Sequence, residues 1–234
     1  MTQDEREGAK GGNALLIFVK YPSPGTVKTR LGPELTPEQS AAFYGALAGE
    51  VVQVHISAAA YESIVCFSPE SARREVRSWL GRDVRLWTQL GDDLGARQFH
   101  AMREALEGGY EKAAIIGSDC PGITPEDIAV AFASLDENDL VLGPCEDGGY
   151  YLIGASRPIE SLFEGISWGS ELVLSETLEK AREAGLTVGL LDVKCDIDSY
   201  GDLERYYRSR RDGAGDRPKT HSWRVLHGIM EGRR

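Results

Sequence analysis

Short apolar runs alternate with longer amphipathic segments along most of the chain. The runs at residues 14–19, 63–67 and 84–88 are bounded by glycine, proline or charged residues, and each predicts a buried strand. A fourth run, at 113–116, ends at Gly117-Ser118-Asp119. Strands that alternate with helices of ten or more residues are typical of a mostly parallel α/β sheet.

The second half of the chain interrupts this alternation once. Residues 139–142 and 150–153 form two strand-like runs with only a short turn between them, which predicts an antiparallel pair. We therefore expect a three-layer α/β/α fold whose sheet has one antiparallel strand. A last strand is expected at 187–193, and helices at 37–59, 69–80, 94–106, from 124 onward, at 170–184 and at 200–210.

The loop after the first strand concentrates positive charge. Residues 18–31 read F-V-K-Y-P-S-P-G-T-V-K-T-R-L, in which two prolines and Gly25 prevent regular structure while Lys20, Lys28 and Arg30 gather three cations. Such a loop can point backbone N–H groups and cationic side chains at an anion. It predicts a phosphate-binding loop, with a solvated surface turn as the alternative.

The overall charge makes this cluster unusual. The chain of 234 residues has a formal net charge of −11, which argues against a nucleic-acid partner; from Arg205 onward the net charge is +6. No apolar run exceeds six residues, so no membrane span is expected. The four scattered cysteines form no C-x-x-C pair, which argues against zinc or a disulfide framework and favours a cytoplasmic protein. We expect a disordered leader at 1–12, one domain at 13–210 and a basic tail at 211–234 that includes a short helix.

Every unusual polar cluster follows a predicted strand, where ligands bind in open parallel sheets. Asp119 follows the fourth strand, and Asp196 and Asp198 alternate around Ile197, so they share a face. Asp119 and one of the later pair would supply carboxylates for Mg²⁺ bound to a polyphosphate. The alternatives are a turn former for Asp119 and helix capping for the later pair, a role that Ser199 or Asp202 could also fill.

Motifs that are absent from the sequence exclude several other reaction types. The glycines of Asp147-Gly148-Gly149 would allow a ligand to approach the backbone, although D-G is also a turn signal. The chain contains no Walker, dinucleotide-binding or zinc-protease motif, and no serine elbow or Cys–His pair. Direct displacement by a bound acceptor therefore fits better than covalent catalysis.

These motifs together resemble a known family. The set comprises the loop at 18–31 and the segments Q-L-G-D-D-L-G-A-R, I-G-S-D-C-P, G-P-C-E-D-G-G-Y-Y-L-I-G and D-I-D-S-Y-G-D-L. From about residue 13 to 208 the chain is similar to the GT-A fold of nucleotide-diphospho-sugar transferases. It more narrowly resembles the glycosyltransferase-like family related to the phospholactate guanylyltransferase CofC and, more distantly, to MobA.

The resemblance implies roles for particular residues. Lys28, Arg30 and Asp119 would be catalytic, and Asp119 and Asp198 would bind Mg²⁺ or Mn²⁺. The D-I-D-S-Y-G-D-L segment has Ser199-Tyr200-Gly201 where the family pattern has Thr-Pro. The substrate-binding positions would be Lys20 and Gly25 at the phosphates, Asp93, Gly95 and Arg97 near the base or ribose, and Asp147, Gly148, Gly149 and Trp168 on the acceptor or sugar side.

Two reactions remain open on these grounds. Nucleotidyl transfer from an NTP is favoured by the amount of positive charge, because three phosphates need more of it than two; glycosyl transfer from an NDP-sugar is favoured by the family's name. Either would need a small-molecule acceptor. A nucleotide- or sugar-phosphate-binding module without catalysis is the third alternative, and the oligomeric state stays open.

Overall fold

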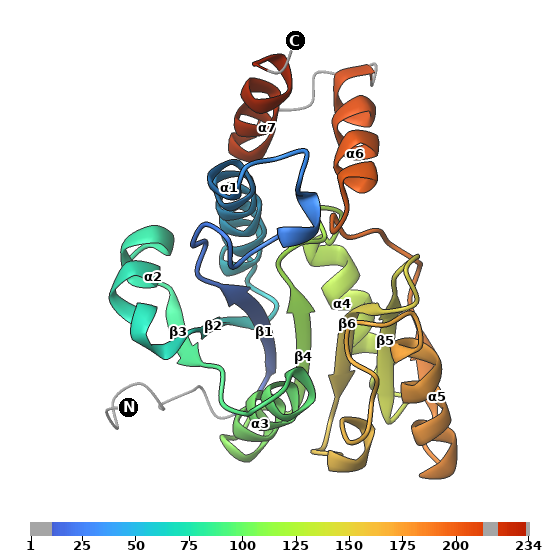
Figure 1. The fold of residues 1–234 in the computed structure, drawn as a ribbon. Coiled ribbons are helices and arrows are strands. Elements are labelled where there is room, and N and C mark those ends of the chain that lie inside the picture. The colour runs from blue at the N-terminus through green and yellow to red at the C-terminus, as the bar shows by residue number, and fades with distance from the viewer. Residues whose placement is uncertain (1–10, 213–219, 233–234) are drawn as a thin grey trace.

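One sheet lies at the centre of the molecule, whose computed structural model describes residues 11–212 and 220–232. Seven strands are ordered β3-β2-β1-β4-β6-β5-β7, and only β6 runs antiparallel to its neighbours (Figure 1). The predicted mostly parallel sheet with one antiparallel strand is therefore confirmed. The strands are β1 (Asn13–Lys20), β2 (Glu62–Ser68), β3 (Arg85–Thr88), β4 (Lys112–Gly117), β5 (Leu140–Pro144), β6 (Tyr150–Ala155) and β7 (Val188–Leu190).

Helices cover both faces of the sheet, which completes the three layers. Apolar side chains of α1, α2 and α4 pack on one face, and those of α3 and α5 pack on the other. A third apolar cluster joins α1 to α6 and α7 through Leu31, Trp223 and Leu226. The helices are α1 (Pro37–Ile56), α2 (Arg73–Leu80), α3 (Leu94–Glu107), α4 (Pro125–Ser134), α5 (Val173–Glu183), α6 (Tyr200–Asp212) and α7 (His221–Glu231).

Local sequence explains where several helices begin. Thr36 and Gln39 form a capping box at α1, and Thr124 and Asp127 form a second one at α4. The helix expected at 170–184 begins later, at Val173, because Ser170 folds back and its hydroxyl donates to the carbonyl of Ser167. The helix expected at 69–80 is divided into a 3₁₀ turn (Glu70–Ala72) and α2.

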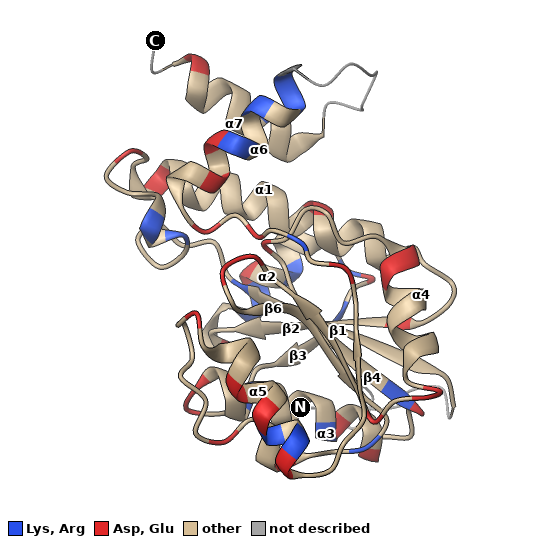
Figure 2. Cartoon of the chain, turned by 90° about the vertical axis from the view of Figure 1, so that its right-hand side faces the viewer, with Lys and Arg blue, Asp and Glu red and all other residues tan. Residues whose placement is uncertain are grey.

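The two ends of the chain extend beyond what the structure describes. Residues 1–10 of the expected leader lie outside the described residues, whereas Gly11 N–H donates to the carbonyl of Gly109. Of the basic C-terminal segment, residues 213–219 and 233–234 also lie outside, and α7 packs on α1. Figure 2 shows Lys and Arg segments on α6. Within the described ranges, no helix combines the length and the apolar character required to traverse a bilayer.

The buried histidine of α1 gives a prediction about stability. His55 is fully buried with Nδ1 2.7 Å from the hydroxyl of Tyr61, and burial lowers its pKa to about 4. Because the unfolded chain takes up this proton near pH 6.5, the stability that neutral His55 provides is present above that pH and is lost as the pH falls toward 4. We expect a His55 contribution of about 2 kcal/mol to the loss of unfolding free energy between pH 7 and pH 5.

Urea denaturation of the wild type and of His55→Gln at several pH values isolates this contribution. The difference in unfolding free energy between the two proteins should change between pH 7 and pH 5. The titration of carboxylates affects both proteins equally and therefore cancels in this difference. Two parallel curves would contradict the assignment.

Candidate active site

The candidate active site lies where the strand order reverses. β1 is flanked by β2 on one side and β4 on the other, so the connections leave the sheet in opposite directions at this point (Figure 1). In open α/β sheets this arrangement leaves a crevice at the carboxyl ends of the two strands. The basic loop follows β1, and Ser118 and Asp119 follow β4.

The Lys28 side chain links the loop after β1 to the end of β4 and to the segment before α6. Its Nζ lies 3.1 Å from Asp119 Oδ2 and 3.5 Å from Asp198 Oδ1, and only 5% of the side chain is exposed. Burial by itself would lower the pKa of Lys28, but the negative charges of Asp119 and Asp198 outweigh it and raise that pKa. Lys28 is therefore a fixed positive charge inside the crevice.

Arg30 adds a second cation at the rim of the crevice. Its Nη1 donates to Asp198 Oδ2 at 2.7 Å, while 66% of the side chain is exposed. Lys28 adopts a left-handed conformation (φ 48°), which is unusual for a residue with a side chain, immediately before the 3₁₀ turn that carries Arg30. The structure thus brings together the charged residues to which the resemblance gives catalytic and metal-binding roles, namely Lys28, Arg30, Asp119 and Asp198.

Backbone contacts hold the carboxylates in place. The N–H of Ile197 donates to the carbonyl of Asp119 at 3.1 Å, which ties the segment before α6 to the end of β4. Gly117 leaves room for the Asp119 carboxylate, since a Cβ there would lie 2.7 Å from Oδ1. Ser199 and Asp202 bond to one another at the start of α6, so the capping expected as an alternative for Asp198 is performed by these two residues.

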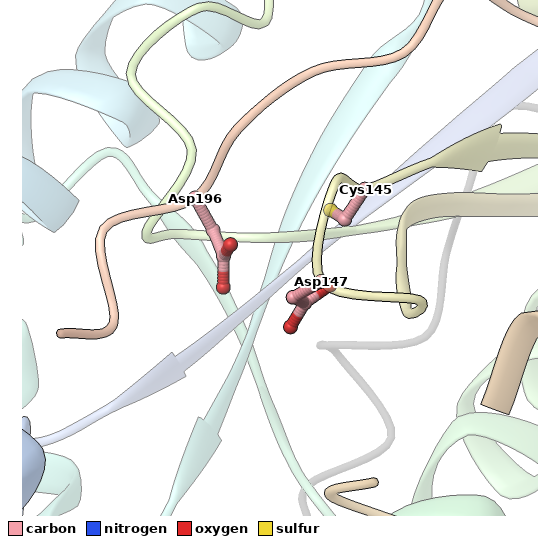
Figure 3. A group of neighbouring side chains, drawn as sticks. All are labelled: Cys145, Asp147 and Asp196. Carbon is pink, nitrogen blue, oxygen red and sulfur yellow. The ribbon is translucent and has the colours of Figure 1, made fainter. Parts of the chain in front are cut away.

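A further carboxylate lies beside this group. Asp196 precedes Ile197 and faces Asp147, which projects from the β5–β6 loop, and Figure 3 shows both near the sulfur of Cys145. Ligand atoms of these three residues lie within 4.8 Å of one another. Burial, together with the charges of Asp119 and Asp147, raises the pKa of Asp196 to about 6.

The donor set fits a hard divalent cation. Asp147 and Asp196 bring carboxylate oxygens together, and the charge of Asp119 also acts on Asp196; such a surplus of carboxylates is what Mg²⁺ and Mn²⁺ prefer. The Cys145 thiol is a poorer ligand because burial raises its pKa. Asp198, the expected partner of Asp119, pairs with Lys28 and Arg30, and Lys28 lies close to Asp119 as well. The sequence signal for Asp196 was its alternation with Asp198 around buried Ile197.

The β5–β6 loop is held against two other segments. The N–H of Glu146 donates to the carbonyl of Lys194, which brings the loop to the segment that carries Asp196. Gly148 has φ 87° and accepts a hydrogen bond from Leu174 N–H at the start of α5; a Cβ on Gly148 would clash with the carbonyl of Glu171. Gly149 N–H donates to Asp147 Oδ1 at 2.9 Å.

Several of the expected substrate-binding residues have structural contacts. Lys20 Nζ donates to the carbonyl of Thr26, so it closes the basic loop upon itself, and Gly25 (φ 75°) lies in the turn between them. Asp93 caps α3 by accepting from Ala96 N–H. None of these contacts involves Lys28, Arg30, Asp119 or Asp198.

Gly95, Arg97 and Trp168 are the remaining residues with an expected role in substrate binding. Gly95 packs so closely that a Cβ would lie 2.7 Å from Trp168 Nε1, and the Trp168 ring meets Tyr150 edge-on. Arg97 Nε donates to the carbonyl of Gly91, and Arg97 also lines a cavity of about 340 Å³ that reaches Asp119 and Asp196. A larger cavity of about 1020 Å³ lies along the outer side of α1, away from these charges.

The raised pKa of Asp196 predicts how metal-free protein responds to a substitution. The folded protein disfavours the ionised carboxylate, so this residue lowers stability above about pH 6 and does so less as the pH falls below that value. We expect Asp196→Asn to raise the melting temperature in EDTA at pH 8, by an amount that disappears near pH 4. Addition of Mn²⁺ should stabilise the wild type more than the variant.

The matched control is Asp136→Asn, which removes an exposed carboxylate paired with Lys112 at the opposite end of β4. Differential scanning fluorimetry with and without Mn²⁺ reads both effects. If Asp196→Asn lowered the melting temperature equally at pH 8 and pH 4, the inference that Asp196 lies among crowded negative charges would be wrong.

Sequence comparison gives the family and its relatives. Residues 51–170 match the family described as "Uncharacterized protein conserved in bacteria (DUF2064)". A phosphoenolpyruvate guanylyltransferase of Sphaerobacter thermophilus is 27% identical over 182 residues, which cover 76% of this chain and 86% of that protein.

Solved structures agree with the fold. The crystal structure of a protein from Desulfovibrio desulfuricans G20, assigned to the nucleotide-diphospho-sugar transferases, superposes with a TM-score of 0.86 at 33% identity and covers 94% of this chain and 97% of its own. The CMP-2-keto-3-deoxy-manno-octonic acid synthetase, solved with CTP, shares the fold alone (TM-score 0.54, 14% identity, 86% and 98% covered). The chain therefore belongs to the DUF2064 family and is an enzyme of the nucleotide-diphospho-sugar transferase superfamily.

Proposed function

We propose that this enzyme transfers a nucleotidyl group from a nucleoside triphosphate to a small phosphorylated acceptor. The observation that carries the proposal is the position of Lys28 Nζ between Asp119 and Asp198, in the crevice where the strand order reverses. This arrangement unites cations suited to phosphates with carboxylates suited to a divalent cation. A polyphosphate is the substrate class that uses both.

The proposed reaction is a direct displacement. A phosphate oxygen of the acceptor forms a bond to the α-phosphorus, the bond from that phosphorus to the oxygen leading to the β-phosphorus breaks, and pyrophosphate leaves. Lys28 and Arg30 would stabilise the negative charge that develops on the leaving pyrophosphate. Arg30 can change partner readily, because its ion pair with Asp198 is solvent-exposed and such pairs contribute little.

We propose Mg²⁺ or Mn²⁺ as the cofactor. Asp147 and Asp196, whose carboxylates cluster, would hold the ion together with Asp119, whose charge contributes to the raised pKa of Asp196; Asp198 stays a further candidate ligand. A bound divalent cation supplies neutralisation of phosphate charge, which complements that from Lys28 and Arg30.

The first substrates to test come from the relative. Because the Sphaerobacter protein is named a phosphoenolpyruvate guanylyltransferase, we propose a phosphorylated small carboxylic acid as the acceptor class and GTP as one donor to include. We expect the reaction to occur in the cytoplasm, which the four free thiols support.

Glycosyl transfer from an NDP-sugar is the second candidate, favoured by the assignment of the Desulfovibrio protein. Thermal shift with a panel of NTPs and NDP-sugars in the presence of Mg²⁺ separates the two. Stabilisation by NTPs is the expected result, whereas stabilisation by NDP-sugars alone would replace our proposal with the second candidate.

Replacing the buried lysine tests the electrostatic part of the proposal. We expect Lys28→Ala to lower kcat/KM by about 10²–10³-fold, the effect typical of removing one charge-stabilising donor. Pyrophosphate release from NTP in the presence of phosphoenolpyruvate is the measurement. Arg182→Ala is the control, because Arg182 forms an exposed pair with Glu179 on α5; similar losses in both variants would argue against a role for Lys28.

Asp119→Asn distinguishes an enzyme from a binding module. We expect turnover to fall by at least about 10²-fold while NTP affinity changes far less, because the variant retains the shape of the crevice. Calorimetric titration with NTP and Mg²⁺ measures the affinity. Wild-type protein that binds nucleotide tightly and turns over no NTP or NDP-sugar would instead indicate a non-catalytic module.

A further inference from the structure

Two neutral side chains in the wall of the 340 Å³ cavity are hydrogen-bonded to each other. Gln98 on α3 and Tyr150 on β6 both line this cavity, which extends to Asp119. The Tyr150 hydroxyl donates to Gln98 Oε1 at 2.8 Å, and only 7% of Gln98 is exposed. Neither residue belongs to the group of charges around Lys28.

This hydrogen bond determines which atoms Gln98 offers to a ligand. With Oε1 occupied by the Tyr150 hydroxyl, the amide directs its Nε2 group elsewhere, and no residue within 11–212 or 220–232 accepts a hydrogen bond from it. Nε2 of Gln98 is not among the buried unpaired side-chain atoms of the described residues, so it is accessible from the cavity that Gln98 lines. A cavity-lining amide with two N–H donors of fixed orientation is therefore suited to a hydrogen-bond acceptor on a ligand.

Gln89 supplies the complementary group. Its Nε2 donates to the carbonyls of Val19 at 3.1 Å and Cys66 at 2.8 Å, which fixes the amide at the ends of β1 and β2. Both N–H groups are used, so Oε1 is the polar atom that Gln89 retains for a ligand in the same cavity. The cavity thus combines a fixed neutral donor with a fixed neutral acceptor.

The charges indicate which part of a nucleotide this pattern suits. The phosphates are best accommodated by Lys28 and Arg30, whereas Phe18, Leu94 and the Tyr150 ring supply apolar and aromatic lining beside Gln98. An uncharged flat group with both donors and acceptors on its edge matches this surface. Nucleobases have this chemistry, and sugars and phosphates lack the flat aromatic face.

We propose that Gln98, positioned by Tyr150, selects the base of the nucleoside triphosphate by donating a hydrogen bond to a base carbonyl or ring nitrogen. Gln98 is then a specificity-determining residue, and Tyr150 is a positioning residue that acts through it. The inference rests on the proposed function, because it takes the cavity to hold the donor nucleotide.

The test measures the affinities of the full-length protein for ATP, GTP, CTP and UTP with Mg²⁺ by calorimetry. The wild type should prefer one base. Gln98→Met removes the donor with little change in volume, and Gln98→Glu replaces the donor by an acceptor. We expect the preferred nucleotide to lose at least about tenfold in affinity in both variants, and the other three to change by less than about threefold, because a base that loses its partner is left with an unpaired acceptor.

Tyr150→Phe tests the positioning role without touching the ligand contact. Freed from the hydroxyl, the Gln98 amide can rotate, so the preference for one base should fall part of the way toward that of Gln98→Met. Gln53→Met is the matched control, because Gln53 donates to the carbonyl of Leu80 at the larger cavity on α1 and should leave all four affinities unchanged.

The outcomes separate this inference from the proposed function. Equal affinity of the wild type for all four NTPs, or an unchanged base preference in folded Gln98→Met and Gln98→Glu, would overturn the role of Gln98 while nucleotidyl transfer could stand. No binding of any NTP to the wild type would overturn the proposed function itself. The melting temperature of each variant shows whether it is folded. If the buried charge of Gln98→Glu prevents folding, the near-isosteric Gln98→Met alone tests the role of Gln98.

Discussion

The arrangement of the site depends on one buried cation. Lys28 costs desolvation energy, and it stays charged in the crevice because Asp119 and Asp198 surround it. The same contacts draw the loop after β1 toward the end of β4 and the segment before α6. Without Lys28 the negative charge of the crevice would be less balanced, and burial with the charges of Asp119 and Asp147 already raises the pKa of Asp196. Lys28 therefore holds three segments of the site together and also provides the positive charge that the proposed reaction uses.

The fold could be predicted because its signals are local. Apolar runs of four to six residues between helical segments indicated the sheet, and the tight connection between β5 and β6 indicated its antiparallel strand. The late start of α5 depends on a contact made over distance as well as on the turn between Ser167 and Ser170. Leu174 donates to Gly148 in a different loop, and no pattern within 170–184 contains that information.

The candidate site was predictable to the level of loops but less so for individual side chains. The carboxyl-end rule placed Lys28, Arg30 and Asp119 in one region. It could not decide between Asp196 and Asp198, because the two alternate around Ile197; in the structure Asp198 pairs with Lys28 and Arg30, whereas Asp196 lies beside Asp147. Gln98 was not visible as a site residue, because an isolated glutamine in a helix acquires meaning only through its bond to Tyr150.

The separation of the paired charges along the chain has a consequence for biosynthesis. Lys28 and Asp198 are 170 positions apart, and the β7–α6 segment contributes the later partner. A ribosome-bound chain that has already paired β1 with β2 still lacks the acidic side of the crevice. During that interval the loop after β1 carries its positive charge without Asp198. The nascent protein thus becomes competent to hold a polyphosphate in the proposed manner only after most of its residues have left the exit tunnel.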